Sequence, residues 1–304
     1  MKQLVDLKLG SSPLQNIQSP LLATAGVTLF VKREDLVDYE LGGNKWRKMK
    51  YNLEAAAQQK HDTLLTFGGA YSNHIYATAA AGKRLGFRSI GIIRGEAQQP
   101  LNPTLQFASD CGMQIEYVDR ASYRRKTETE FIQTLKDRHG RFYLLPEGGS
   151  SSLALKGCAE IIEELDEEFD YICSACGTGG TLAGLISGLN TQQKAIGFAV
   201  LKGGDFLSSN IQNFLRQVDI EPVASWEIKT DYHFGGYAKT KTELWNFIEQ
   251  FKKDFDIPLD GVYTGKMFYG LFDSIKKGYF PKGSRIIAIH TGGLQGSLGF
   301  NKKY

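Results

Sequence analysis

Short apolar runs alternate along the chain with stretches in which apolar residues recur every three or four positions. The short runs predict buried strands, and the longer period predicts helices with one apolar face. Strands that alternate with helices form a parallel sheet covered by helices, so the pattern predicts an α/β protein. The expected strands are Thr63–Phe67, Ser89–Arg94, Gln114–Val118, Phe142–Leu145, Tyr171–Cys173, Ala195–Leu201 and Arg285–His290.

Two of the helical stretches have a clear pattern. Residues 75–85 predict a helix, which a glycine ends at position 86. An acidic stretch predicts another helix over residues 160–168, because Ile161, Leu165 and Phe169 recur at intervals of four and the acids between them face water.

Four strand ends run into paired glycines, at FGGAYSNH (67–74), CGTGGTLAG (176–184), LKGGD (201–205) and IHTGGL (289–294). Ligands of open α/β sheets bind beyond the carboxyl ends of the strands, where glycine lets the backbone approach them closely. The pattern therefore predicts one crevice lined by several loops. Tight turns with a purely structural role are the alternative.

The segment CGTGGTLAG carries the most information about the ligand. It is not the dinucleotide fingerprint, because Leu182 stands where the third glycine is needed, and it lacks the Gly-Lys-Ser/Thr of a Walker A loop. What remains is a loop, 177–181, with two hydroxyls and several N–H groups at a helix start. Such a loop suits a single phosphate group without magnesium.

A second cluster poses a question of charge. Lys45, Arg47, Lys48 and Lys50 lie where a helix begins, although cations are favoured at the opposite end. A lysine beside other cations has a lowered pKa, and its neutral amine is a nucleophile suited to a Schiff base. Together with a phosphate loop, this favours pyridoxal 5′-phosphate (PLP). The other three cations are expected to face the surface or nearby carboxylates. Four solvated side chains are the alternative.

Composition sets broad limits. The 304 residues are 42% hydrophobic and 23% charged with a net charge of +3, which is typical of a globular protein that binds no nucleic acid. The basic run at 120–126 is interpreted as a solvated loop or helix face. No signal peptide or membrane-spanning run is recognised, so a cytoplasmic protein is expected. The CxxC formed by Cys173 and Cys176 lacks partner ligands and is interpreted as buried reduced thiols.

Seven motifs together carry a family resemblance over almost the whole chain. The sequence resembles the 1-aminocyclopropane-1-carboxylate (ACC) deaminase / D-cysteine desulfhydrase family of PLP enzymes, which has the tryptophan synthase β-like fold (fold type II). The motifs are VKREDL (31–36), GGNKWRK (42–48), GGAYSNH (68–74), GTGGTLAG (177–184), GGYAK (235–239), GVYTGK (261–266) and GYFPKGSRIIAIHTGG (278–293).

The resemblance implies two lobes, each with an open, mostly parallel sheet covered by helices. The smaller lobe would span residues 48–145, and the larger PLP-binding lobe would combine residues 1–47 and 146–304. A homodimer acting on a small amino acid is also implied.

The resemblance assigns roles to particular positions. Lys45 would be the Schiff-base lysine and Asn73 would bond the ring phenolate, whereas helix capping is the alternative for Ser72 and Asn73. Catalytic roles fall to Lys45, Ser72, Tyr237 and Tyr263, although a half-buried aromatic is the alternative for each tyrosine. The cofactor would be held by Lys45, Asn73, Gly177, Thr178, Gly179, Gly180, Thr181 and Thr291. The substrate would contact Ser72, Asn73, His74, Tyr237, Tyr263 and Thr264.

Two positions separate the activities of the family. In ACC deaminases the corresponding motifs are similar to YEGK and HLGG. This chain has YTGK and HTGG, with Thr264 in place of the glutamate and Thr291 in place of the leucine. A glutamate can keep a pyridine nitrogen protonated and a hydroxyl cannot. The expected activity is therefore D-cysteine desulfhydrase, which yields pyruvate, sulfide and ammonia. ACC deamination to 2-oxobutyrate is the alternative. A PLP- or phosphate-binding module without turnover, or a nucleotide-dependent enzyme, represents a different class.

Overall fold

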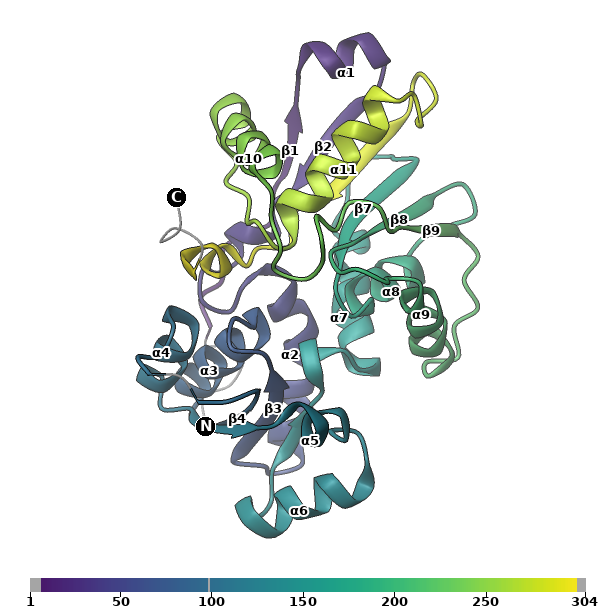
Figure 1. The fold of residues 1–304 in the computed structure, drawn as a ribbon. Coiled ribbons are helices and arrows are strands. Elements are labelled where there is room, and N and C mark those ends of the chain that lie inside the picture. The colour runs from purple at the N-terminus through teal and green to yellow at the C-terminus, as the bar shows by residue number, and fades with distance from the viewer. Residues whose placement is uncertain (1–6, 98, 300–304) are drawn as a thin grey trace.

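The computed structural model describes residues 7–97 and 99–299 and contains two separate β-sheets (Figure 1). The larger sheet has six strands in the order β1-β2-β10-β7-β8-β9, and only β1 runs antiparallel to its neighbour. The smaller sheet has four parallel strands in the order β5-β4-β3-β6. The predicted α/β fold class with two mostly parallel sheets is confirmed. The strands are β1 (Leu14–Ile17), β2 (Thr28–Lys32), β3 (Thr63–Gly68), β4 (Arg88–Arg94), β5 (Gln114–Val118), β6 (Tyr143–Leu145), β7 (Tyr171–Cys176), β8 (Lys194–Ala199), β9 (Ser225–Lys229) and β10 (Arg285–Ile289).

Helices cover both sheets, and α2 lies between the larger sheet above and the smaller sheet below in Figure 1. The predicted boundary between the lobes, at residues 47 and 48, falls inside this continuous helix. The α-helices are α1 (Pro20–Ala25), α2 (Gly43–Gln58), α3 (Asn73–Leu85), α4 (Pro103–Asp110), α5 (Arg120–Arg124), α6 (Thr129–His139), α7 (Ser152–Glu163), α8 (Gly180–Ser187), α9 (Phe206–Arg216), α10 (Thr242–Phe255) and α11 (Thr264–Lys276). Three short 3-10 turns are η2 (Glu34–Leu36), η3 (Glu147–Gly149) and η4 (Leu294–Gly299).

The helix predicted over residues 160–168 was wrong in its extent. Helix α7 begins at residue 152, because the Ser151 hydroxyl accepts a hydrogen bond from the N–H of Ala154, and it ends at Glu163. Leu165 and Phe169 lie beyond the helix, although both pack against the apolar cluster beneath it. The spacing identified the inward-facing residues but not the end of the helix.

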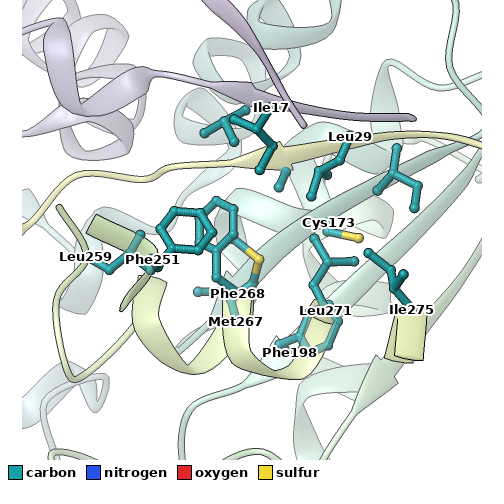
Figure 2. Close-up of a cluster of buried hydrophobic side chains, with 14 of the residues drawn as sticks. Ile17, Leu29, Cys173, Phe198, Phe251, Leu259, Met267, Phe268, Leu271 and Ile275 are labelled. Carbon is teal, nitrogen blue, oxygen red and sulfur yellow. The ribbon is translucent and has the colours of Figure 1, made fainter. Parts of the chain in front are cut away.

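The largest apolar cluster joins helix α11 to the larger sheet (Figure 2). Met267, Phe268 and Leu271 lie on one face of the helix and are completely buried. They pack toward Leu29 of β2 and Cys173 of β7. Because Tyr263 immediately precedes α11, this packing also positions a predicted site residue. All four cysteines are unbonded, and Cys173 and Cys176 are buried on β7.

Helices α2, α7 and α8 pack closely enough to need glycine at their contacts. A Cβ at Gly157 of α7 would lie 1.9 Å from the backbone oxygen of Arg47 on α2. A Cβ at Gly184 of α8 would lie 2.4 Å from the Cβ of Cys158 on α7. Helix α7 therefore fixes the distance between the start of α2, which carries Lys45, and the start of α8, which follows the loop predicted to hold a phosphate.

Replacing Gly157 with alanine should force α2 away from α7, because backbone atoms cannot yield as a flexible side chain can. We expect Gly157→Ala to lower the free energy of unfolding by at least about 2 kcal/mol. Urea unfolding followed by circular dichroism measures the change. The exposed Glu163→Ala on the same helix is the control and should change stability by less than about 0.5 kcal/mol. Equal stability of the two variants would show that α2 and α7 can separate freely.

Candidate active site

One cavity lies where strands β3, β7 and β10 end and where helix α2 begins. Three of the four glycine-containing strand ends line it, at 68–74, 176–184 and 289–294. The fourth end lies farther out, where Leu201 lines an adjoining outer groove. Many of the predicted site residues meet in this cavity, namely Lys45, Ser72, Asn73, His74, Gly177, Thr178, Gly179, Thr181, Tyr263 and Thr291.

Lys45 lies in the first turn of α2, and its Nζ donates to the Oδ1 of Asn44 at 3.0 Å. Burial, reinforced by the nearby charge of Lys48, lowers the pKa of Lys45 to about 7. Much of the amine is therefore neutral near neutral pH, and a neutral amine is a nucleophile and a base.

Lys48 differs from the sequence prediction, which placed it at the surface or beside carboxylates. Only 2% of it is exposed, and it lines the cavity. Its Nζ donates to the backbone oxygen of Gly148 at 2.6 Å and to the Oγ of Ser150 at 2.9 Å, and that hydroxyl lies 2.8 Å from the Oγ1 of Thr178. Burial lowers the pKa of Lys48 to about 8. One turn of helix after Lys45 returns the chain to the same face, and this signal in the sequence was missed.

The sequence predicted that Arg47 and Lys50 would lie at the surface or beside carboxylates. In the structure both pair with carboxylates. The guanidinium of Arg47 is buried and donates to Glu34 at 2.9 and 3.0 Å and to Glu164 at 2.6 Å. Lys50 forms an ion pair with Glu160. The pair with Glu34 ties the start of α2 to turn η2, and the pair with Glu164 ties it to the segment after α7.

The loop after β7 is shaped to hold an anion. Gly179 has a φ of 88°, which a residue with a side chain rarely adopts, and it starts helix α8 without a side-chain cap. The N–H groups of the first turn of α8 are thus available to a ligand. Thr181 is held by the Nδ2 of Asn44, which donates to its hydroxyl at 2.9 Å. Gly180 is buried as the first residue of α8 and belongs to the same turn.

Ser72 and Asn73 lie where β3 leads into α3. The Ser72 hydroxyl accepts from the N–H groups of His74 and Ile75 at 3.2 and 3.3 Å, so the capping role weighed from sequence is present. The Asn73 Oδ1 accepts from the Nε2 of Gln295 at 2.9 Å. Gln295 also lines the cavity, and sequence reasoning missed it. Its place four residues after Thr291 was the only available signal.

His74 is buried with only 1% exposed, and neither ring nitrogen has a hydrogen-bond partner within the described residues. Burial and the charges of Lys48 and Lys45 lower the pKa of His74 well below its usual value, so the imidazole is neutral. A buried polar group without a partner is costly. A ligand in the cavity that offered polar atoms to this ring would remove that cost.

Tyr263 and Tyr237 approach each other where the cavity opens into the outer groove. Their hydroxyl oxygens are 3.4 Å apart and their rings meet edge to face with centroids 6.0 Å apart. Tyr237 lines only the outer groove and is 40% exposed. Burial raises the pKa of Tyr263 well above its usual value, so this hydroxyl keeps its proton at neutral pH.

Three predicted site residues do not line the cavity, namely Gly180, Tyr237 and Thr264, and of these Thr264 has a structural role. It is completely buried, and its hydroxyl donates to the Oδ2 of Asp260 at 2.6 Å. The Asp260 carboxylate also accepts from the N–H groups of Val262 and Tyr263 at 2.7 Å each. Asp260 therefore caps the start of α11 and holds the backbone of Tyr263. An aspartate four residues before a threonine at a helix start was the signal for this cap.

The cavity wall contains no carboxylate among residues 7–97 and 99–299. Within the same residues, no three His, Cys, Asp or Glu side chains are arranged to hold a metal ion. The outer groove has a different character, because Arg94, Arg120 and Lys126 line it together with Glu147. The cavity thus offers a partly neutral amine, an ammonium, hydroxyls and N–H groups, which fit an aldehyde with a phosphate group.

Comparison with known proteins agrees with this geometry. The family profile described as "Pyridoxal-phosphate dependent enzyme" matches residues 5–292. A putative 1-aminocyclopropane-1-carboxylate deaminase of Pyrococcus horikoshii is 32% identical over 309 residues, which cover 98% of this chain and 94% of that protein. The bifunctional D-cysteine desulfhydrase/1-aminocyclopropane-1-carboxylate deaminase of Arabidopsis thaliana, named as mitochondrial, is 32% identical over 89% of this chain and 73% of its own length.

Solved structures share the fold. The crystal structure of an ACC deaminase homologue has a TM-score of 0.82 and 30% sequence identity, and the match covers 99% of this chain and 96% of that one. None of the helices in the described part of the chain is long and apolar enough to cross a membrane.

Lys48→Met should raise the pKa of Lys45, because it removes the positive charge that disfavours a second ammonium nearby. The rate at which Lys45 reacts with an added aldehyde and cyanoborohydride should then need a higher pH to reach half its maximum. Mass spectrometry of the peptide containing Lys45, over a series of pH values, measures this midpoint. Lys50→Met is the control and should leave it in place. A midpoint that stayed at its wild-type pH in Lys48→Met would contradict the electrostatic coupling.

Proposed function

Since the chain belongs to the family of pyridoxal-phosphate dependent enzymes, we propose that it is a lyase that converts D-cysteine to pyruvate, sulfide and ammonia. The observation that carries this proposal is a partly neutral Lys45 in a cavity whose described wall holds hydroxyls and no carboxylate. The homodimeric state in this proposal follows from the sequence resemblance, and the cytoplasmic location follows from the sequence pattern alone.

PLP supplies an aldehyde that bonds to amines and an aromatic ring that stores electrons. In this proposal the phosphate is held by the first N–H groups of α8 and the hydroxyls of Thr178 and Thr181, and Lys48 adds a positive charge beside them. Lys45 would bond the aldehyde. Asn73 would hold the ring hydroxyl, with its amide oriented by Gln295.

Proton transfer from the substrate falls to a base at the cavity wall. Once the amino group of the substrate had displaced Lys45 from the aldehyde, the freed Nζ of Lys45 would accept the proton from Cα of D-cysteine, because burial and the nearby charge of Lys48 keep much of this amine neutral. Ser72 is the alternative base, and its hydroxyl is held at the start of α3 by the N–H groups of His74 and Ile75.

The leaving group departs toward the two tyrosines. The electron pair of the Cα–H bond becomes the Cα=Cβ bond while the Cβ–S bond breaks and sulfur keeps its pair. Tyr263 retains its proton at neutral pH and can donate it to the departing sulfur, with Tyr237 beside it. Water then hydrolyses the aminoacrylate product to pyruvate and ammonia.

ACC asks for different chemistry, because its α-carbon carries no proton and its ring must be opened at another carbon. A glutamate in place of Thr264 or another carboxylate at the cavity would help to keep the pyridine nitrogen protonated. The Thr264 hydroxyl is instead engaged by Asp260, and Thr291 offers only a hydroxyl. These features support the desulfhydrase over the deaminase. The named activities of the relatives make ACC deamination the second candidate.

Borohydride treatment of the yellow purified protein should attach the cofactor permanently to Lys45. Peptide mass spectrometry should find the added mass on this residue, and Lys45→Ala should lose both the added mass and turnover while keeping its circular dichroism spectrum. Lys50→Ala is the control for a general effect of losing a lysine, because Lys50 pairs with Glu160 away from the cavity and this variant should still be labelled at Lys45. Label on any other lysine, or a colourless protein, would refute the assignment.

A substrate panel separates the candidate activities. We expect sulfide and pyruvate from D-cysteine, pyruvate from β-chloro-D-alanine, and at least about tenfold lower kcat/KM for ACC, since a tenfold ratio needs only about 1.4 kcal/mol of differential transition-state binding. L-cysteine and D-serine test stereochemistry and the leaving group. Rapid 2-oxobutyrate formation from ACC would favour the deaminase. A yellow protein inactive on the whole panel would indicate a binding module.

A further inference from the structure

Lys266 is a completely buried lysine that the proposed chemistry does not use. It lies on helix α11, and its Nζ donates to three backbone oxygens, those of Val200 at 3.1 Å, His233 at 2.9 Å and Gly236 at 2.8 Å. The first oxygen belongs to the segment after β8. The other two belong to the loop that carries Tyr237, so one ammonium joins three segments of the chain.

The charge of this ammonium is held by carbonyl dipoles rather than by a carboxylate. Within the described residues no carboxylate lies at ion-pair distance from Lys266, and burial lowers its pKa to about 8. Taking an ammonium out of water without an ion pair is costly, so all three of its donors must be satisfied for it to remain charged. The three carbonyl oxygens meet that requirement and form a small site for a cation.

The loop around Tyr237 needs such an anchor. Phe234 and Ala238 both have a φ of 54°, in the left-handed region that residues with side chains avoid. Each such residue costs of order 1–3 kcal/mol and persists only when its surroundings hold it. Gly235 and Gly236, with φ values of 98° and 132°, complete a segment that would relax to other conformations if released.

The same lysine lies one turn of helix beyond Tyr263. Asp260 fixes the backbone of Tyr263 at the start of α11, and Lys266 fixes the loop of Tyr237 against the same helix. The two anchors together bring the tyrosine hydroxyls to 3.4 Å. Phe234 also packs edge to face against Tyr269 of α11, whereas the ammonium binds the carbonyl oxygen of Gly236, the residue directly before Tyr237.

We propose that Lys266 is a positioning residue whose ammonium serves as an internal cation, binding the carbonyl oxygens of Val200, His233 and Gly236 so that Tyr237 stays opposite Tyr263. This inference rests on the proposed function only for the role of the tyrosines at the leaving group. The placement of the loop by the ammonium stands apart from it.

Lys266→Met removes the charge and keeps a similar volume. We expect kcat for D-cysteine to fall at least about tenfold with a smaller change in KM, because a displaced catalytic group chiefly affects the transition state. The visible absorbance of the bound cofactor should be unchanged. The exposed Lys276→Met on the same helix is the control and should keep wild-type kcat.

A double-mutant cycle with Tyr237→Phe shows whether Lys266 acts through that tyrosine. In the Lys266→Met background, Tyr237→Phe should lower kcat by less than twofold further, since the hydroxyl is already displaced. Full additivity of the two losses would overturn the proposal. Amide hydrogen exchange over residues 233–239 should also accelerate in Lys266→Met and not in Lys276→Met.

Rescue by a free cation separates charge from packing. Lys266→Ala removes three side-chain carbons and the ammonium, and n-propylammonium has the same number of carbons and the same charge. Adding this cation should therefore restore kcat several-fold and slow hydrogen exchange in the loop. 1-Propanol, which has a similar size and no charge, should restore neither. Equal effects of both additives would overturn the inference, as would unchanged exchange in both variants. If the wild-type protein turned over no substrate in the panel, the proposed function would fail while hydrogen exchange still decided the role of Lys266.

Discussion

The ion pairs of Arg47 with Glu34 and Glu164 are the interaction on which the site depends. They cancel one of the cations at the start of α2 and tie that helix to the segments before and after it. The Glu34 side chain is completely buried, so breaking its pair with Arg47 would cost about 3–5 kcal/mol, whereas Glu164 is 43% exposed and its pair contributes less. Lys45 and Lys48, one helical turn apart, line the cavity. The charge at the helix start is thus tolerated because Arg47 and Lys50 are paired with carboxylates, Lys48 is bound to a carbonyl and a hydroxyl, and Lys45 is partly neutral.

The cavity contains a reactive amine and a buried imidazole whose nitrogens have no hydrogen-bond partners in the described chain. Lys45 is kept partly neutral by burial, and His74 has two buried nitrogens without partners in the described chain. Both conditions cost stability in the free protein, and a ligand with polar atoms relieves them. The close packing of α7 against α2 and α8 offsets this loss of stability. Gly157 and Gly184 permit that packing, because a side chain at either position would clash with the neighbouring helix.

Much of the fold and part of the site could be predicted from the sequence. Paired glycines after apolar runs located three of the loops that line the cavity, because parallel strands bring their carboxyl ends to one edge. Lys48, Asp260 and Gln295 were missed, since each acquires its position through tertiary contacts with distant segments. Helix α7 was placed too late because acidic residues continue past its end and resemble a helix surface. The boundary proposed at residue 47 falls within α2, where composition does not change.

The position of β10 has a consequence for how the protein forms during synthesis. It is the last strand of the described chain, yet it lies between β2 and β7 in the middle of the larger sheet. The strands of the smaller sheet follow one another between residues 63 and 145. This sheet can therefore fold while later residues are still being synthesised. The larger sheet must wait until residue 289 has emerged, and pairing over such a separation is slow. A nascent chain therefore exposes the unpaired edges of β2 and β7 until β10 has emerged, and the candidate cavity is complete only once Gln295 has emerged.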